Sequence, residues 1–362
     1  MLNNIRIIDA DGHVQEKDAP WHELLEEPYK KLAPRVVKDS NGRAELLLEG
    51  KIWAKPTGVG CGIGAAPLSR RPQATTGMFD PVQRLKDMDL EGIDTAVNFG
   101  TTVFLSLPFL ENRDLACAIA RAYNNWLAAY CRKDPKRLKG VALVPMQEPA
   151  EAVKELVRCV KQLGFVAVAT SAHSAGRNLD HPDFYPFYAA AEELGVPVCV
   201  HVGSGRPAAA ADRFDNPLFV HATTHTFEQM IGVMCIVAGG ILERFPKLKV
   251  AFLEAGAGWV PYWMERLDEH YEYLQPVVPW LTKPPSEYMR SDQVYYSFEP
   301  DEQTLPFIAD FVGEDRLIFA SDYNHGDSKF PHTVEAVTRR EGLSESRLRK
   351  LMGENAARLY NI

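Results

Sequence analysis

No stretch of the sequence reaches the roughly 18 apolar residues that a membrane-spanning helix needs. No basic run is long enough to follow a phosphate backbone. Residues 1–8 lack the long apolar core of a secretory signal. Across 362 residues, 40 Lys and Arg stand against 48 Asp and Glu, a formal net charge of −8. We therefore expect a cytoplasmic protein that binds neither a membrane nor nucleic acid.

Several catalytic signatures are also missing. The sequence has no HExxH zinc motif, no complete G-x-S-x-G nucleophile turn, and no glycine-rich phosphate turn after an early strand. Its six cysteines are scattered, form no CxxC pair and lie mostly in apolar segments. We expect buried, reduced thiols, and neither a serine hydrolase nor a doubly wound nucleotide-binding sheet.

Short β-branched runs alternate with longer amphipathic patterns, and this alternation is typical of βα units in a parallel sheet. The sequence contains eight candidate strands: 5–10, 95–99, 140–144, 165–169, 196–201, 248–253, 294–298 and 317–320. The clearest helical patterns between them are 113–132, 149–163, 185–194, 227–237 and 259–274. Eight strands with intervening helices predict an α/β protein with a (β/α)8 TIM barrel.

The connection between the first two strands is unusually long for a barrel. We expect residues 1–362 to form a single domain in which residues 14–80 are a large insertion. Two interpretations remain open for this insertion. It is either a surface loop or a lid over the barrel mouth that offers Arg70 or Arg71 to an anionic substrate.

Polar residues with metal-binding chemistry stand at the ends of four predicted strands. Functional groups of a parallel barrel come from these C-terminal ends, which open on one face. Buried charged groups are costly unless they are paired or bound to metal. The occurrence of such groups at four strand ends on one face therefore predicts a metal site. The candidate ligands are Asp11, His13, His201, Glu254, Asp322 and His325.

Six donors exceed what one zinc ion requires, because zinc takes three or four protein ligands. Two ions with shared carboxylates would use the surplus, and a mixed set of carboxylates and imidazoles suits iron or manganese as well as zinc. His325 has a second interpretation, as a group that orients a ligand or faces substrate. Asp9 is expected to orient a ligand rather than to bind metal.

Other polar residues near the strand ends are candidates for contact with substrate. His173 follows the fourth predicted strand, and Asn324 follows Asp322. His225 stands at the predicted start of the helix 227–237, where it either faces the barrel mouth or neighbours the helix cap. Glu254 and His225 are the candidate catalytic groups for proton transfer.

Four segments carry a resemblance to a known family. They are Asp-x-Asp-x-His at 9–13, Gly-Gly-Ile-Leu-Glu-Arg-Phe-Pro at 239–246, Ala-Ser-Asp-Tyr at 320–323 and Gly-Glu-Asn-Ala-Ala-Arg-Leu-Tyr at 353–360. Together they resemble the amidohydrolase 2 family, which includes aminocarboxymuconate-semialdehyde decarboxylase-like, metal-dependent hydrolases and decarboxylases. The resemblance implies one barrel with one metal held by Asp11, His13, His201 and Asp322. The decarboxylase branch has His-x-His where this chain has Asp11-Gly12-His13, and a histidine where it has Glu254.

Three functions follow as hypotheses. The first is a metal-dependent enzyme that hydrolyses or decarboxylates a small organic acid. The second is a dinuclear non-haem iron, or manganese and iron, oxygenase on the same scaffold. The third is a non-catalytic partner subunit of such an enzyme. The resemblance implies a homo-oligomer, and an assembly that includes a paralogous subunit stays open as an alternative.

Overall fold

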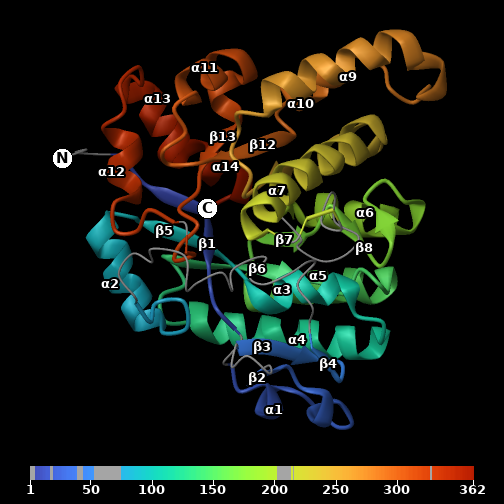
Figure 1. The fold of residues 1–362 in the computed structure, drawn as a ribbon, viewed down its shortest axis with the longest axis vertical. Coiled ribbons are helices and arrows are strands. Elements are labelled where there is room, and N and C mark those ends of the chain that lie inside the picture. The colour runs from blue at the N-terminus through green and yellow to red at the C-terminus, as the bar shows by residue number, and fades with distance from the viewer. Residues whose placement is uncertain are drawn as a thin grey trace.

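The computed structural model describes residues 5–16, 19–38, 44–52, 75–201, 213–214, 216–326 and 328–362. Eight parallel strands form one sheet in the order β1-β5-β6-β7-β10-β11-β12-β13 (Figure 1). Their bounds are β1 Ile8–His13, β5 Thr95–Phe99, β6 Leu138–Leu143, β7 Ala167–Thr170, β10 Val198–Val200, β11 Val250–Phe252, β12 Val294–Phe298 and β13 Leu317–Phe319. The predicted (β/α)8 architecture is confirmed.

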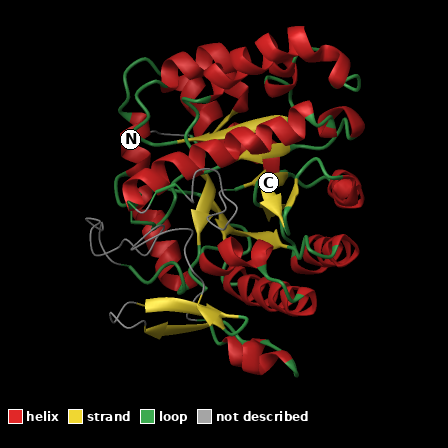
Figure 2. Ribbon diagram, turned by 45° about the vertical axis from the view of Figure 1, so that its right-hand side comes forward, coloured by secondary structure: helices red, strands yellow, loops and turns green. Residues whose placement is uncertain are grey.

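Hydrogen bonds at the strand ends bring the first and last strands together. The amide of Asp322 donates to Asp11 O (3.1 Å), and the amide of His13 donates to Tyr323 O (2.9 Å). The sheet is therefore a nearly closed barrel, surrounded by helices (Figure 2). Strand β1 begins and ends later than the predicted 5–10, so Asp11 and His13 lie within the strand itself.

Long helices pack around the barrel, and local signals explain their ends. The Asn112 side chain caps the start of one helix by accepting from Leu115 N, and Gly164 and Gly195 end two others with φ of 72° and 68°. The long helices are α2 Pro81–Glu91, α4 Arg113–Cys131, α5 Pro149–Leu163, α6 Tyr185–Leu194, α7 Pro217–Val233 and α9 Val260–Leu274. The predictions for α5 and α6 match their bounds.

The prediction of a helix over 227–237 is wrong at its start. Helix α7 begins at Pro217, because the Asn216 side chain accepts from Leu218 N and proline is favoured in a first turn. The chain then continues as a π-helical turn, η5 Met234–Ala238. As a result His225 lies in the middle of α7, about two turns after Pro217, and not at the start of a helix as the sequence predicted.

The connection from β1 to β5 contains a small sheet of its own. Strands β2 Arg35–Lys38, β3 Ala44–Leu48 and β4 Lys51–Ile52 pair in antiparallel fashion below the barrel in Figure 1. Its β3–β4 turn is anchored to the barrel layer, because Glu49 Oε1 accepts from Asn112 N (2.6 Å) at the start of α4. Arg70 and Arg71 lie outside the described residues, so their predicted contact with substrate stays a prediction, as does the role of 14–80 as a lid.

Shorter elements complete the described chain. They are α1 Trp21–Leu24, η1 Tyr29–Leu32, α3 Thr102–Ser106, η3 Leu107–Phe109, β8 His173–Ser174, β9 Arg177–Asn178, η4 Pro182–Phe184, α8 Ile241–Arg244, η6 Gln275–Val277, α10 Pro285–Met289, α11 Leu305–Ile308, η7 Ala309–Gly313, η8 Glu314–Arg316, α12 Thr333–Thr338, α13 Glu345–Arg349, η9 Lys350–Glu354 and α14 Asn355–Tyr360. None of the helices in the described ranges is long and apolar enough to cross a bilayer. The described cysteines are buried and free, as predicted: Cys117, Cys131, Cys159, Cys199 and Cys235.

Candidate metal centre

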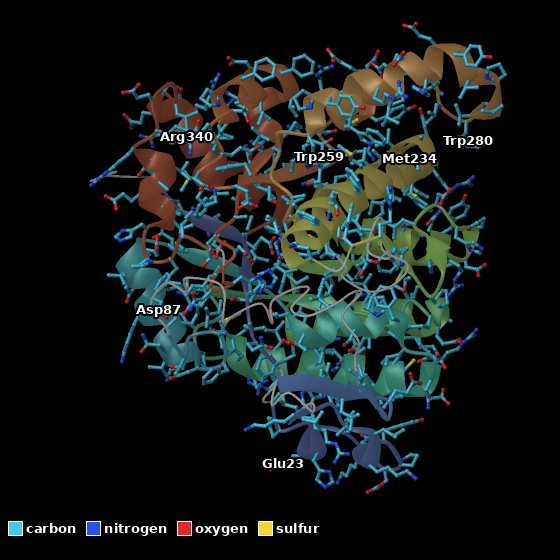
Figure 3. The ribbon with its side chains drawn as sticks, viewed as in Figure 1. Glu23, Asp87, Met234, Trp259, Trp280 and Arg340 are labelled. Carbon is cyan, nitrogen blue, oxygen red and sulfur yellow. The ribbon has the colours of Figure 1, made fainter. Side chains whose placement is uncertain are left out.

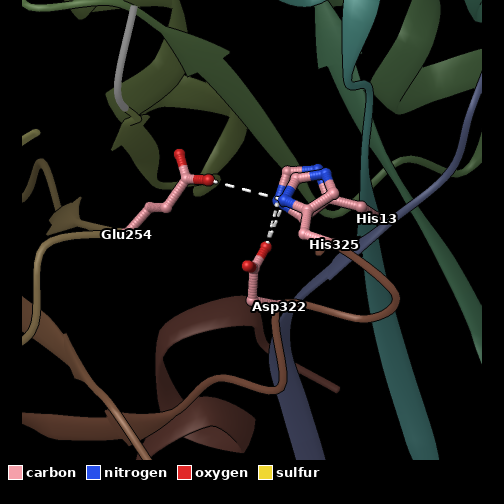
Figure 4. Close-up of side chains that lie close together, drawn as sticks. All are labelled: His13, Glu254, Asp322 and His325. Carbon is pink, nitrogen blue, oxygen red and sulfur yellow. Dashed lines mark ion pairs between the residues drawn. The ribbon is translucent and has the colours of Figure 1, made fainter. Parts of the chain in front are cut away.

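The six predicted ligands converge at the C-terminal ends of the barrel strands. Asp11 and His13 lie on β1, His201 follows β10, Glu254 lies two residues beyond β11, and Asp322 lies three residues beyond β13. His325 enters from the loop after Asp322 and meets Glu254 and Asp322 in Figure 4. Two overlapping groups, Asp11-His13-His201 and His13-Glu254-Asp322-His325, have donor atoms close enough together to hold a metal ion.

Three donor atoms are arranged as the ligands of one ion would be. His13 Nε2 lies 3.3 Å from His201 Nε2, and each of these nitrogens lies 3.5 Å from Asp11 Oδ1. Donors bound about 2.1 Å from a common ion at the tetrahedral angle lie about 3.4 Å apart. The spacing of Asp11, His13 and His201 therefore fits one divalent cation. Asp322 Oδ1 also lies 3.5 Å from His13 Nε2, but its donor atoms group with those of Glu254 and His325.

The Asp11 carboxylate supplies a second test of that fit. Its side chain is almost completely buried, and Oδ1 accepts no hydrogen bond from any residue that the structure describes. Burial raises the pKa of Asp11, although His201 opposes this effect. A buried carboxylate oxygen without a hydrogen-bond donor is costly, and a bound cation would remove that cost.

His13 and His201 both present Nε2 to the cluster because Nδ1 is engaged elsewhere. His13 Nδ1 lies 3.2 Å from the carbonyl oxygen of Gly100, and His201 Nδ1 lies 3.2 Å from Glu254 Oε2. Such contacts hold the tautomer in which Nε2 carries the free lone pair. Burial, assisted by His325 and His201, lowers the pKa of His13 well below its usual value. The ring is therefore neutral, which is the form that binds metal.

His325 differs from the other candidate ligands. Its Nδ1 lies 2.6 Å from Asp322 Oδ1 and 3.6 Å from Glu254 Oε1, while Nε2 lies 3.2 Å from Thr101 Oγ1. Burial lowers the pKa of His325, but Asp322 and Glu254 outweigh it and raise the pKa well above its usual value. A separation of 2.6 Å is that of a short, charge-assisted hydrogen bond, shorter than the edge between two ligands of one ion. His325 is thus placed to hold a proton.

Glu254 lies between two histidines. Burial raises the pKa of its carboxyl group, but His201, His325, His225 and His13 together hold that pKa well below its usual range. Its backbone, with φ of 58°, and that of Asp322, with φ of 49°, are in the left-handed region that side chains other than glycine rarely adopt. Non-glycine residues in this conformation gather at functional sites, where the surroundings maintain the strain.

A pocket of about 320 Å³ opens beside the cluster. Its wall includes Glu254 and Asp322 on one side and His221 and His225 of α7 on another. The two α7 rings lie with centroids 4.0 Å apart and planes inclined by 30°. The structure therefore brings the predicted catalytic pair Glu254 and His225 to one cavity.

Of the predicted substrate contacts that the structure describes, neither His173 nor Asn324 lines this pocket. His173 is buried against the ring of Phe109 (centroids 5.2 Å apart), and its Nε2 lies 3.5 Å from Glu228 Oε2. Asn324 is half-buried in the loop after β13 and is absent from the pocket wall. Sequence reasoning gave His221 no role, because the predicted helix began after it. It also missed Thr101, although Thr101 stands just after a predicted strand, where the other candidates were sought.

Comparison with known proteins identifies the family to which this chain belongs. The sequence model of the amidohydrolase family matches residues 8–362, so the chain belongs to this family and is an enzyme. It is 27% identical over 282 residues to 2-amino-3-carboxymuconate-6-semialdehyde decarboxylase of Dictyostelium discoideum, covering 77% of this chain and 76% of that one. It is 26% identical over 318 residues to gamma-resorcylate decarboxylase of Polaromonas sp. strain JS666, covering 83% and 93%.

A solved structure shows the same fold. It is a dihydroxybenzoic acid decarboxylase from Polaromonas sp. JS666, with bound manganese and the inhibitor 2-nitroresorcinol. It superposes with a TM-score of 0.70 at 22% identity and covers 99% of this chain and 97% of its own. The relatives named here are decarboxylases, so they lend no support to the oxygenase hypothesis.

Proposed function

We propose that this enzyme is a metal-dependent carboxy-lyase that removes CO2 from a small aromatic acid. One divalent ion, manganese or zinc, would be held by Asp11, His13, His201 and Asp322. The observation that carries the proposal is the 3.3–3.5 Å spacing among the donor atoms of Asp11, His13 and His201, with Asp322 Oδ1 3.5 Å from His13 Nε2. The decarboxylase names of the relatives, and the manganese in one structure of the same fold, support the choice of reaction and of metal.

One ion, together with the ion pairs around it, would use all six donor residues of the cluster. The two donors beyond the four ligands, on Glu254 and His325, make contacts with each other and with the side chains of ligands. The surplus that suggested two ions is thereby used by hydrogen bonds and ion pairs. This argument supports a mononuclear site over the dinuclear oxygenase.

The proposed reaction breaks the bond between the ring carbon and the carboxylate carbon. The electron pair stays on the ring carbon, which takes up a proton, and CO2 leaves. A divalent ion bound at this site supplies the positive charge that orients and polarises the oxygen atoms of the substrate. The residues of the chain must supply the proton and hold the ring.

We assign proton transfer to Glu254 and His225, with His325 as the group that stores the proton. His325 contacts both Asp322 and Glu254, and its raised pKa keeps it protonated at neutral pH. Glu254 links this histidine to the pocket, where His225 forms part of the wall. General acid or base groups placed in this way typically contribute about 10²–10⁴-fold to a rate. The pocket volume suits an acid with a single ring.

The test combines metal analysis with product detection. The full chain, purified without added metal, should contain about one divalent ion per chain. It should release CO2 from gamma-resorcylate or a related hydroxybenzoate, and lose this activity after treatment with a chelator. Two iron ions per chain together with consumption of dioxygen would establish the oxygenase instead. Cleavage of amides or esters without CO2 release would establish a hydrolase.

A further inference from the structure

A buried arginine lies next to strand β1 and the loop after β13, which carry three of the proposed metal ligands. Arg84 belongs to α2, and its side chain is 1% exposed. Its Nη2 lies 3.1 Å from Oδ2 of Asp9, which is also completely buried. A fully buried ion pair is costly in desolvation and is weak evidence for stability alone. The pair therefore calls for an explanation in terms of the site above it.

The Asp9 carboxylate connects both ligand-bearing turns. Its Oδ1 accepts from the amide of Asp11 (3.3 Å) and from the amide of Ser321 (2.9 Å). Its Oδ2 accepts from Ser321 Oγ (2.6 Å) and from Arg84 Nη2 (3.1 Å). Asp11 and the neighbour of Ser321, Asp322, are both proposed ligands. One carboxylate thus fixes the main chain at two of the four ligand positions.

The guanidinium of Arg84 is itself held on two sides. Its central carbon lies 3.6 Å from the centroid of the Tyr323 ring, whose hydroxyl donates to Asp87 Oδ2 (Asp87 is labelled in Figure 3). On the other side lies Gly12, between two proposed ligands, where any Cβ atom would collide with Arg84 Nη2. The absence of a side chain at position 12 is what lets the guanidinium approach the strand.

Hydrogen bonds alone do not account for the burial of Arg84. Its Nε and Nη1 are buried and donate to none of the residues that the structure describes. Leaving such donors unpaired costs free energy that a simple anchoring residue would not require. What Arg84 provides at this place is positive charge against Asp9 and a planar surface against Tyr323.

We propose that Arg84 and Asp9 are a positioning pair for the metal centre. The pair holds Asp11, His13 and Asp322 in the geometry of ligands without touching the ion, and Gly12 is the residue that admits it. This inference rests on the metal site of the proposed function, but not on the reaction carried out there. Partners that orient ligands typically change metal affinity about 10- to 100-fold.

The experiment compares Arg84→Met with a matched control, Arg316→Met. Arg316 also lies over a tyrosine ring, that of Tyr295 at 5.1 Å, but it stands at the opposite end of β13 from Asp322. Two quantities are measured on the full chain: amide hydrogen exchange of the metal-free protein, and the Kd for Mn²⁺. Arg84→Met should speed exchange at the amides of Asp11, Ser321 and Asp322. It should also raise the Kd for Mn²⁺ about 10- to 100-fold.

The control Arg316→Met should lose stability but should change neither the exchange of the three amides nor the Kd for Mn²⁺. Equal changes of Kd in Arg84→Met and Arg316→Met would overturn the proposal, because the effect would then be a general loss of stability. Unchanged exchange at the three amides in Arg84→Met would overturn it as well. If Arg84→Met does not fold, Ser321→Ala removes one hydroxyl bond to Asp9 and should show the same two effects at smaller size. Unchanged exchange and an unchanged Kd in Ser321→Ala would also contradict the positioning role of Arg84 and Asp9.

The two measurements keep this inference separate from the proposed function. A chain that binds Mn²⁺ but releases no CO2 would end the carboxy-lyase proposal, while the exchange and affinity data would still decide the role of Arg84. Arg84→Lys serves as a rescue variant. Because lysine keeps the charge but not the planar surface, it should recover part of the Mn²⁺ affinity.

Discussion

At the N-terminal ends of the barrel strands, buried and half-buried polar side chains donate to main-chain carbonyl groups, whereas at the C-terminal ends polar side chains face one another. Gln293, just before β12, donates its Nε2 to the carbonyl oxygens of Phe245 (2.9 Å) and Leu248 (3.1 Å). Asn355 donates to the carbonyl oxygen of Leu317 (2.7 Å) at the start of β13. These are hydrogen bonds between uncharged groups, and they connect segments that are distant in the sequence.

The opposite end collects carboxylates and imidazoles beside a pocket. There Asp11 Oδ1 accepts no hydrogen bond from the described part of the chain, and two residues adopt left-handed backbone conformations. The difference shows that polar groups at one end stabilise the fold, while those at the other are arranged around a charge that the chain alone does not supply. Substitutions at the two ends should therefore affect different measurements.

The largest effect is expected for His201→Ala. This change removes Nε2 from the donor set and leaves Asp11 and His13 with one neighbour fewer. Metal affinity should fall by more than the hundredfold or so typical of outer partners, with activity lost in parallel. Elemental analysis after dialysis measures the effect, with His332→Ala as the control at an exposed histidine. Full metal content in His201→Ala would show that the site is misplaced.

Glu254→Gln should have the next largest effect. The amide keeps the size of the side chain but loses the charge that faces His201 and His325. We expect kcat to fall about 10²–10⁴-fold while about one metal ion per chain is retained. Steady-state kinetics give kcat and KM separately. The control is Glu302→Gln, a half-buried carboxylate that accepts from Ala257 N (3.1 Å) outside the cluster. A change in KM alone would reduce Glu254 to a binding role.

Gln293→Ala tests the other end of the barrel. Removing the amide takes one hydrogen bond from each of the carbonyl oxygens of Phe245 and Leu248, which should lower the free energy of unfolding by about 1–3 kcal/mol. Urea denaturation of the metal-free protein measures this loss, and the Kd for Mn²⁺ should stay that of the parent. If metal affinity falls together with stability, the two ends of the barrel are not independent.

The smallest effect is a dependence on pH at His173. Burial lowers the pKa of this histidine below its usual value of 6.5. The unfolded chain then binds the proton more readily than the folded one. The stability that the neutral ring contributes is present above about pH 6.5 and is lost as the pH falls through the lower, folded pKa, by at most about 1.4 kcal/mol per pH unit.

The variant His173→Phe should remove this part of the acid sensitivity. Urea unfolding of the metal-free protein at several pH values between about 5 and 7 measures the slope in the parent and the variant. His270→Phe, at an exposed histidine, is the matched control and should keep the parent slope. Identical slopes in the parent and His173→Phe would mean that Glu228, 3.5 Å away, compensates for burial of the ring.

The barrel and the ligand cluster were predictable because both depend on local signals. Strands of β-branched residues end where polar residues begin, and parallel strands open on one face. That rule alone brought Asp11, His13, His201, Glu254 and Asp322 together. The bounds of β1 were missed because the polar residues 9–13 do not resemble a strand until their partners across the barrel are known.

Residues that act across long separations gave no local signal. Arg84 contacts Asp9 from 75 positions away, and in the sequence it is one of several charged residues in an ordinary amphipathic pattern. His221 was passed over because the apolar period of α7 becomes clear only after Phe227, well beyond the cap at Asn216. In both cases the information lies in the packing of helices on the barrel, which a single sequence does not show.

The left-handed backbone at Glu254 and Asp322 has a consequence for the evolution of this enzyme. Glycine adopts that conformation without strain, and asparagine does so more readily than most residues. Selection for thermal stability alone would therefore favour replacing both carboxylates, and it would produce a more stable barrel without activity. Directed evolution of this chain would have to screen for turnover at every round, because substitutions that relieve the backbone strain at Glu254 and Asp322 would remove the carboxylates proposed for its activity.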